Sequence, residues 1–298
     1  MRVFVTGATG YIGSAVVRDL LDAGHQVVGL ARSDGAAAAL TATGAEVQRG
    51  SLQDLDVLRS AANAADGSVH TAFVHDEFID FSGAAEVDRV AIQALGEALA
   101  GSDRPLVVAS GTGQLSQSNV ITEETDVPEI QPFPRFSEET ALRFADRGVR
   151  ASAVRLPPTV HGRGDRAFVP HMIQFARDKG AAAYIGEGTN VWPAVHRLDA
   201  ARLFRLALES APAGRRLHAN DEQGIPLRRI AETIGAGLGL PVKSVTAKQA
   251  ADYLGWVAPF AALENPTSSV LTREWLGWRP EQVGLIEDIQ AGHYFTQQ

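Results

Sequence analysis

The sequence predicts an α/β protein built on a doubly wound parallel sheet, followed by a smaller C-terminal α/β domain. Two observations predict this class. Over the first 110 residues, Val-rich and nearly all-apolar runs of strand length alternate with segments of helical period, which is typical of parallel strands that helices cover on both faces. The stretch TGATGYIG at 6–13 joins the first apolar run to the first helical segment through closely spaced glycines, as in dinucleotide-binding units of the Rossmann type.

The elements of the expected sheet follow in order along the chain. The strands are expected at RVFVT, HQVVGLA, AEVQRG, SVHTAFV and PLVVAS, and the helices between them at 11–23, 34–43, 53–63 and 83–100. After Ser110 a polar, proline-containing loop leads to a helix expected at 137–147. We interpret Glu138 and Glu139 as first-turn acids that complement the dipole of this helix. The strand VRASAVRLP follows it.

Beyond residue 160 the pattern becomes less regular and predicts a second domain. Residues 1–160 are expected to form the dinucleotide-binding domain, with 190–218 packing back on it. Residues 161–189 and 219–298 are expected to form a cap that binds the substrate. Helices of the cap are expected near 225–239, 247–254, 269–276 and 281–290.

The composition excludes several classes of function. A formal net charge of −8 opposes binding along a nucleic acid, which needs a basic face. The absence of cysteine excludes thiolate metal sites and a cysteine nucleophile, and the eight histidines are too scattered to predict a metal site. The chain shows neither the pattern of a signal peptide nor an apolar run of membrane-spanning length. We therefore expect a cytoplasmic protein that binds a small-molecule substrate, without nucleic-acid or membrane partners.

Each glycine of the first turn has a physical reason. Gly7 permits the tight turn, Gly10 lets the backbone approach a pyrophosphate, and Gly13 lets the helix pack close to the strand. The phosphates would lie at the helix N-terminus, where backbone N–H groups and the helix dipole attract anions. The residues of this turn expected to hold a dinucleotide are Gly7, Thr9, Gly10, Tyr11, Ile12 and Gly13.

The end of the second expected strand indicates which dinucleotide is bound. Chains that bind NAD place an acidic residue there, which accepts a hydrogen bond from the ribose 2′-hydroxyl, but this chain has Ala31, Arg32 and Ser33. Arg32 could stack on the adenine and pair with a 2′-phosphate, and Ser33 could donate a hydrogen bond to that phosphate. NADP(H) is therefore favoured over NAD(H), and the alternative for Arg32 is a solvated place on the surface.

These motifs make the chain similar to the short-chain dehydrogenases/reductases, of the extended type that includes the NAD-dependent epimerase/dehydratase family. The resemblance covers the whole chain in order, and the stretches that carry it are TGATGYIG at 6–13, Ser51 with Leu52, FVH at 73–75 at the end of the fourth strand, ASGT at 109–112 and VRLPPTVHG at 154–162. It implies hydride chemistry with a nicotinamide cofactor. Because family members often dimerise, it also implies a homodimer formed through helices 83–100 and 137–147.

The resemblance further implies roles for single residues. Ser51 and Leu52 would lie near the adenine, and either Ser110 or Thr112 would bond the substrate oxygen. The residues implied to pass beside the ribose and phosphates are Phe73, Val74 and His75, and those implied to border the nicotinamide are Leu156, Pro157, Pro158 and Val160. For the apolar residues among them, packing in the core is the alternative.

One departure from the family pattern concerns the catalytic acid. The family places a Tyr four residues before a Lys on one helix, where the Lys binds the nicotinamide ribose and lowers the pKa of the Tyr from about 10. Between Tyr11 and Tyr184 this chain has no tyrosine, and its first lysine is Lys179. In the segment PFPRFSEETALRF, where the pair belongs, the same spacing gives Pro134 with Glu138, or Phe136 with Thr140.

Several side chains could replace the missing pair. The candidates are the hydroxyls of Ser110 and Thr112, the imidazoles of His75 and His161, and the phenol of Tyr184. An imidazole titrates near pH 6.5 and exchanges protons without a neighbouring lysine, although a histidine in a loop more often has a structural role. The same applies to Trp192 and His196, which could face the cleft.

Two classes of function fit these observations. The first is an NADP(H)-dependent oxidoreductase of the extended type that transfers hydride between the cofactor and a small carbonyl or alcohol, without the Tyr–Lys pair. The second is a dinucleotide-binding redox sensor or regulator without turnover. A nucleotide-sugar epimerase or dehydratase is disfavoured, because its proton shuttle relies on the missing pair.

Overall fold

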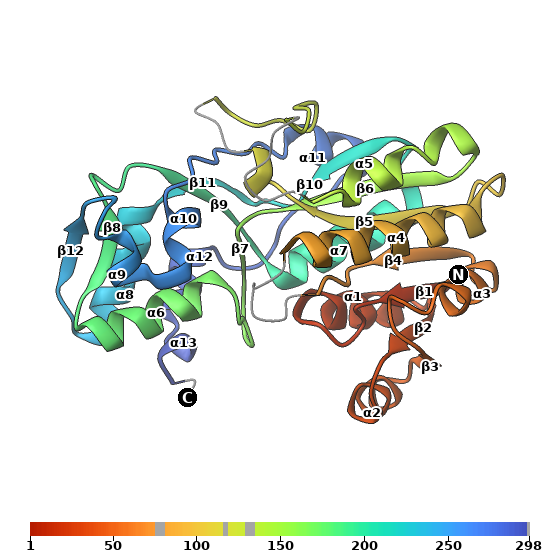
Figure 1. Ribbon diagram of the computed structural model, residues 1–298, viewed down its shortest axis with the longest axis horizontal. Helices are drawn as coiled ribbons and strands as arrows, with labels where there is room; N and C mark the ends of the chain where they lie inside the picture. The colour runs from red at the N-terminus through yellow and green to blue at the C-terminus, as the bar shows by residue number, and fades with distance from the viewer. Residues whose placement is uncertain (75–80, 116–118, 129–134, 297–298) are drawn as a thin grey trace.

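The computed structural model describes residues 1–74, 81–115, 119–128 and 135–296, and it confirms the doubly wound parallel sheet. Within these residues, seven parallel strands pair in the order β10-β6-β5-β4-β1-β2-β3 (Figure 1). The strands are β1 (Arg2–Thr6), β2 (Gln26–Ala31), β3 (Glu46–Arg49), β4 (Gly67–His70), β5 (Pro105–Gly111), β6 (Arg150–Leu156) and β10 (Arg215–His218). The order changes direction between β1 and β4, and such a switch point opens a crevice at the carboxyl ends of the strands.

Helices cover both faces of this sheet, because its central strands are apolar on both sides. Val3 and Val5 of β1 pack in one cluster with Val16 and Phe204, whereas Phe4 points to the opposite face. The first face is covered by α1 (Tyr11–Asp22), α2 (Asp34–Thr43) and α7 (Arg197–Ser210). The second face is covered by α3 (Leu55–Asn63), α4 (Phe81–Leu99) and α5 (Ser137–Leu142).

In the larger lobe, the fourth strand and the helix that follows the polar loop are clearly shorter than predicted. The strand expected at SVHTAFV ends at His70, after which Thr71 N–H donates to the Thr6 carbonyl oxygen and the chain passes directly beside Gly7. β1 turns into α1 at the same level, so the chain beyond His70 has no partner on the β1 side, although β5 continues to Gly111 on the other side. The helix expected at 137–147 ends at Leu142, and a 3₁₀ turn at Ala145–Arg147 follows it.

The smaller lobe carries two further sheets and lies beside the carboxyl ends of the large sheet (Figure 1). β7 (Thr159–His161), β9 (Val191–His196) and β11 (Glu222–Pro226) pair in one, and β8 (Ala182–Ile185) pairs with β12 (Val242–Val245) in the other. Its helices are α6 (Phe168–Lys179), α8 (Leu227–Leu238), α9 (Ala250–Leu254), α10 (Ala258–Ala261), α12 (Leu285–Gln290) and α13 (His293–Thr296). In the part of the chain that the structure describes, no helix is long and apolar enough to cross a membrane.

The chain crosses between the two lobes more often than the sequence indicates. Of residues 190–218, α7 and β10 pack on the large sheet, whereas β9 belongs to the smaller lobe. α11 (Val270–Leu276), which we expected in the cap, returns to the larger lobe and contacts α7 and β10. Trp278 follows it into the core of that lobe, where its indole N–H donates to the Asp199 carbonyl oxygen at 3.0 Å.

Candidate active site

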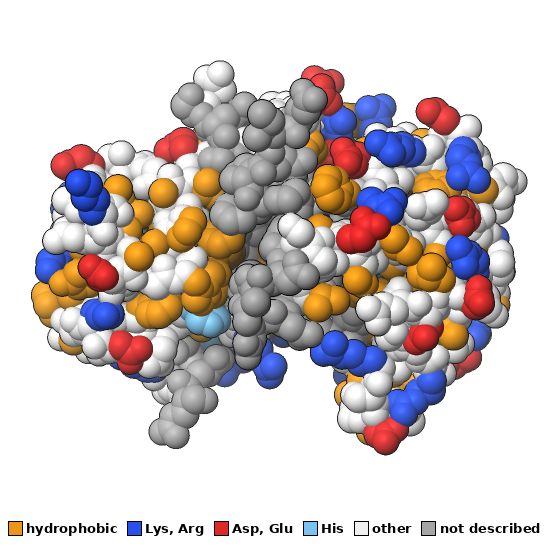
Figure 2. Space-filling view, in the orientation of Figure 1, with side chains coloured by type: hydrophobic (Ala, Val, Ile, Leu, Met, Phe, Trp, Pro, Cys, Tyr) orange, Lys and Arg blue, Asp and Glu red, His pale blue; other side chains and the backbone are white. Residues whose placement is uncertain are grey.

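A cleft of about 1730 Å³ lies between the carboxyl ends of the large sheet and the smaller lobe. Its walls come from the loops after β1 to β6 on one side and from residues 166–171 and 256–263 on the other. On the smaller lobe, Figure 2 shows hydrophobic side chains gathered beside the groove between the lobes. The cleft therefore occupies the place where open α/β sheets bind their ligands.

The glycine turn has the shape that a dinucleotide phosphate requires. Gly7 has a φ of +69°, and a Cβ at Gly13 would lie 2.0 Å from the Gly7 carbonyl oxygen, so neither position accepts a side chain. Gly10 caps α1 in an extended conformation, and its N–H donates to the Gly7 carbonyl oxygen at 2.8 Å. The bare N-terminus of α1 faces the cleft and fits a pyrophosphate.

The end of β2 places Arg32 and Ser33 on the cleft wall. Ser33 caps α2, because its Oγ accepts a hydrogen bond from Ala36 N–H at 3.2 Å. Arg49, at the end of β3, donates to the Ser33 carbonyl oxygen at 2.6 Å and forms an ion pair with Asp34. This ion pair offsets the negative charge of Asp34 beside the N-terminus of α2, which leaves a region suited to an anionic group.

The other residues expected to contact a cofactor also line the cleft where the structure describes them. They are Thr9, Tyr11, Ile12, Ser51, Leu52, Phe73, Val74, Leu156, Pro157, Pro158 and Val160. Ser51 is further fixed by Asp54, whose carboxylate accepts hydrogen bonds from the Ser51 N–H and hydroxyl at 2.7 and 2.9 Å. His75, expected both beside the cofactor and as a proton carrier, lies outside the described residues.

The two hydroxyls expected to bond the substrate lie at the carboxyl end of β5, but only one of them, that of Ser110, belongs to a residue that lines the cleft. Ser110 lines the cleft, and its Oγ accepts a hydrogen bond from Gln114 Nε2 at 3.4 Å. Thr112 is fully buried and does not line the cleft, because its hydroxyl donates to Asn265 Oδ1 at 2.7 Å and its carbonyl accepts from Asn265 Nδ2 at 2.8 Å. This corrects the expectation that Thr112 could bond the substrate oxygen, and Ser110 remains.

His161 also lies away from the cleft. It is 1% exposed on β7, and its Nδ1 is 2.9 Å from Asp288 Oδ2, while His293 Nε2 is 2.9 Å from the other carboxylate oxygen. Burial raises the pKa of Asp288, but the hydrogen bonds from the two histidines outweigh it and hold that pKa below its usual value. The prediction that His161 carries a proton to the substrate is thus corrected, because its ring is buried against Asp288 and does not line the cleft.

Three other residues that the sequence suggested for the cleft have structural roles elsewhere. Tyr184 lies in β8 with its ring 5.6 Å from the Arg228 guanidinium, and Trp192 is fully buried in the core of the smaller lobe. His196 caps α7, because its Nδ1 accepts a hydrogen bond from Leu198 N–H. None of the three is among the described residues that line the cleft.

Glu138 does more than complement a helix dipole. It is 2% exposed, and its two carboxylate oxygens accept hydrogen bonds from the fully buried Arg155 at 2.6 and 2.7 Å. Arg216 lies 2.9 Å from the same carboxylate. Glu139 is exposed, as a first-turn acid on the surface should be.

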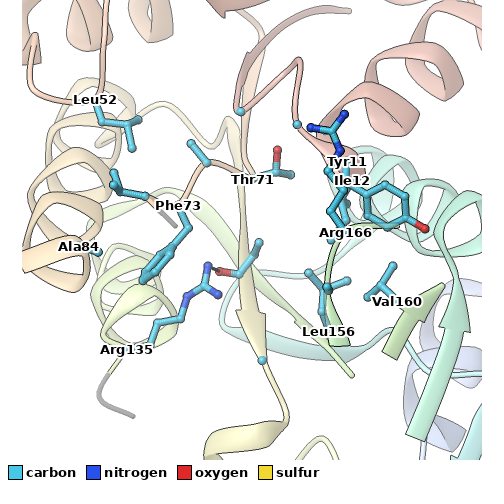
Figure 3. A pocket seen from close by; sticks show the side chains of 18 of the residues that line it. Tyr11, Ile12, Leu52, Thr71, Phe73, Ala84, Arg135, Leu156, Val160 and Arg166 are labelled. Carbon is cyan, nitrogen blue, oxygen red and sulfur yellow. Dashed lines mark hydrogen bonds between the residues drawn. The ribbon is translucent and has the colours of Figure 1, made fainter. Parts of the chain in front are cut away.

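Arg135 is the main residue of the cleft that the sequence analysis missed. Its guanidinium points into the cavity beside Phe73, 4.5 Å from the centre of that ring (Figure 3). Its Nε donates to Ser137 Oγ at 2.9 Å, and its Nη2 donates to the Ala109 carbonyl oxygen at 3.1 Å. Arg135 lies within PFPRFSEETALRF, the segment where the family places its tyrosine. We call Ser110, Gln114 and Arg135 the polar end of the cleft.

The smaller lobe contributes an aromatic wall, made of Phe168, His171, Trp256 and Phe260. Ring centres lie 5.0 Å apart for Phe168 and Phe260, 5.5 Å for Phe168 and Trp256, and 4.9 Å for His171 and Trp256. The sequence signal for this wall is weak: a spacing of three residues in α6 and of four residues across 256–260. Each spacing alone is equally typical of core packing.

The fold and the cleft define an α/β protein with a Rossmann-type parallel sheet and a second, smaller lobe across the cleft. Residues 3–219 match the family model of the NAD dependent epimerase/dehydratase family, and the chain belongs to that family. It is thus an extended short-chain dehydrogenase/reductase.

Individual comparisons agree with this assignment. The chain is 51% identical over 297 residues to the Schizosaccharomyces pombe protein C2A9.02, covering 99% of this chain and all of that protein. It is 25% identical over 267 residues to a 2-alkyl-3-oxoalkanoate reductase of Stenotrophomonas maltophilia, covering 81% of this chain and 77% of the reductase. Its fold is similar to that of DesIV, a dTDP-glucose 4,6-dehydratase of Streptomyces venezuelae solved with NAD and TYD bound, with a TM-score of 0.77 at 20% identity over 99% and 97% of the two chains.

Proposed function

We propose that this protein is an NADP(H)-dependent oxidoreductase that transfers hydride between the cofactor and a small carbonyl or alcohol compound in the cleft. The single observation that carries the proposal is the continuity of the cleft. One cavity joins the glycine turn and Arg32 at the cofactor end to Ser110 at the other. A cofactor and a second small molecule can therefore lie in contact.

The charge at the end of β2 supports the preference for NADP(H). Arg32 and Ser33 line the cleft where an NAD-binding chain has an acid. Arg32 is exposed, so it can turn toward a 2′-phosphate, and the N-terminus of α2 adds its partial positive charge at Ser33. The same groups would contribute little to the binding free energy of NAD(H), which carries a neutral 2′-hydroxyl in place of the phosphate.

Reduction is supported by the names of distant relatives, one of which is a reductase of 2-alkyl-3-oxoalkanoates. When bound, NADPH would supply the hydride that reduces a carbonyl carbon and leave as NADP⁺, and the carbonyl oxygen would keep the π electron pair and take a proton. The residues of this chain bind and orient the reactants: the glycine turn takes the pyrophosphate, and Ser110 donates a hydrogen bond to the substrate oxygen.

The cofactor assignment is tested by calorimetric titration of NADP⁺ and NAD⁺ into wild type, Arg32→Ala and the control Arg18→Ala, since Arg18 is an exposed residue of α1 that does not line the cleft. Loss of a charge-assisted contact should weaken NADP⁺ binding by about tenfold to a hundredfold in Arg32→Ala alone, and leave NAD⁺ binding nearly unchanged. Equal effects on both nucleotides would contradict the preference.

Turnover is tested separately, by following the oxidation of NADPH in the presence of a panel of aldehydes and ketones. Turnover with any of them supports the oxidoreductase. The missing Tyr–Lys pair favours a second candidate, a redox sensor that binds NADP(H) without turnover, and tight binding with no oxidation across the panel would support it.

A further inference from the structure

The polar end of the cleft is held by a buried chain of hydrogen bonds that reaches Arg135. Thr6 Oγ1 lies 2.8 Å from His70 Nδ1, and His70 Nε2 lies 3.0 Å from Asp88 Oδ1. The other oxygen of Asp88 accepts a hydrogen bond from the Ser137 hydroxyl at 2.5 Å, and Ser137 Oγ in turn accepts from Arg135 Nε. Arg135 is thus oriented before any ligand arrives.

The same contacts influence the pKa values of Asp88 and Arg135, the two charged groups in this series of hydrogen bonds. Burial raises the pKa of Asp88, but the hydrogen bond from His70 and the charge of Arg135 outweigh it, so the pKa lies below its usual value and the carboxylate is ionised. Burial lowers the pKa of Arg135 from its usual value, and the negative charge of Asp88 opposes that shift by favouring the charged guanidinium. A fixed cation in a partly dry cleft interacts more strongly with negative charge than one in water.

Gln114 indicates that the polar end is built for a ligand that both accepts and donates hydrogen bonds. It is 8% exposed and lines the cleft, and its Oε1 has no hydrogen-bond partner among the residues that the structure describes. A buried acceptor without a partner costs free energy until a ligand donates to it. An alcohol can accept from Arg135 and donate to Gln114 with one oxygen.

The opposite side of the cleft selects for an apolar body. Within the described part of the smaller lobe, Arg166 is the one arginine, lysine, aspartate or glutamate that lines the cleft, and Figure 3 places it beside Tyr11 and Ile12, at the glycine turn. The other described residues of the smaller lobe that line the cleft include those of the aromatic wall together with Ala167 and Leu263. Sugar hydroxyls against such a surface would lose their hydrogen bonds to water, whereas an aromatic ring would stack on it.

We infer that the substrate is a carbonyl compound with an aromatic or similarly flat apolar body, which lies against the aromatic wall while Arg135 binds its oxygen in place of the missing tyrosine. This inference rests on the proposed function and names its substrate class. Arg135 remains protonated throughout, so it stabilises the negative charge that the oxygen acquires, and the proton comes from water. The product hydroxyl then donates to Gln114 Oε1.

The test uses three stable probes. Cinnamate combines a ring with a carboxylate that copies the charge on the reduced oxygen, cinnamamide keeps the ring without the charge, and crotonate keeps the charge without the ring. Each is titrated calorimetrically into the protein with and without NADP⁺. Wild type should bind cinnamate about tenfold more tightly than either other probe, as expected for one charged hydrogen bond and one buried ring.

Single substitutions test which residues cause the preference for the charged probe and the preference for the probes with a ring. Arg135→Gln should lose the preference for cinnamate over cinnamamide, and Arg135→Lys should keep part of it. Trp256→Leu should weaken cinnamate and cinnamamide equally and leave crotonate unchanged. Arg147→Gln is the matched control, because Arg147 also lies over an aromatic ring, at 4.8 Å from Phe144, but outside the cleft. It should behave as wild type.

The outcomes also separate this inference from the proposed function. If Arg135→Gln binds cinnamamide normally and still prefers cinnamate, the role of Arg135 is overturned. If wild type binds all three probes alike, the substrate class is overturned. A chain that binds cinnamate selectively but binds neither NADP⁺ nor NADPH would retain the Arg135 site and refute the oxidoreductase.

Discussion

Tyr11 and Gly162 are 151 residues apart in the chain, yet the Tyr11 hydroxyl donates a hydrogen bond to the Gly162 carbonyl oxygen at 3.2 Å. Gly162 N–H donates to the Tyr294 hydroxyl at 3.1 Å, and that hydroxyl donates to Asp165 Oδ2 at 3.0 Å. The glycine turn of the larger lobe is thereby linked to the C-terminal helices of the smaller one. Any movement of one lobe relative to the other must carry or break this link.

Replacing Tyr11 by Phe removes the hydroxyl of this link and little else. The loss should lower the free energy of unfolding by about 1 kcal/mol, the usual net worth of a neutral hydrogen bond. Tyr184→Phe is the matched control, since Tyr184 lies outside the cleft. Urea unfolding of the three proteins measures the difference, and equal stabilities would show that the link contributes nothing.

Replacing Gly13 by Ala should abolish dinucleotide binding. The added Cβ would lie 2.0 Å from the Gly7 carbonyl oxygen, so the glycine turn must open. Gly35→Ala is the control, because Gly35 also lines the cleft but meets no atom within 4 Å. Titration with NADP⁺ should show normal binding for the control and none for Gly13→Ala, and binding by both would contradict the role of the third glycine.

Replacing Glu138 by Gln should destabilise the fold strongly. It leaves the fully buried Arg155 without its charged partner, and breaking a buried ion pair from one side costs about 3–5 kcal/mol. Glu139→Gln, on the exposed side of the same short helix, should change stability by less than about 0.5 kcal/mol. Thermal and urea unfolding compare the two neighbours directly.

Asp165 should make stability depend on pH in an unusual direction. Burial raises its pKa to about 6, against hydrogen bonds from Ala167 N–H and the Tyr294 hydroxyl. The unfolded value is about 3.9, so between about pH 4 and pH 6 the folded chain binds more protons, and the free energy of unfolding falls as the pH rises. The contribution is about 2–3 kcal/mol.

Asp165→Asn removes this titration. Urea unfolding at both ends of the window should show wild type losing stability relative to the variant as the pH is raised. Parallel pH profiles for the two proteins would show that the pKa of Asp165 does not change on folding.

The sequence predicted the larger lobe well because its signals are local. Val-rich strands and the glycine turn predict the sheet, and the wall of the cleft at the glycine turn, within a few residues of each signal. The polar end could not be predicted in this way: Arg135 becomes a cleft residue through Asp88 and Ser137, which lie in different elements. His161 misled for the converse reason, because a histidine after a strand resembles a site residue until its partner Asp288, 127 residues away, is known.

Trp278 and α11 have a consequence for attempts to dissect the molecule. The core of the larger lobe draws on Phe204, Leu217 and Trp278, all far beyond residue 160. A recombinant fragment that ends at residue 160 would therefore expose the apolar face of α1 that α7 covers in the whole chain. The larger lobe is therefore not an independent N-terminal domain, because its core is complete only with α7, β10 and Trp278 in place.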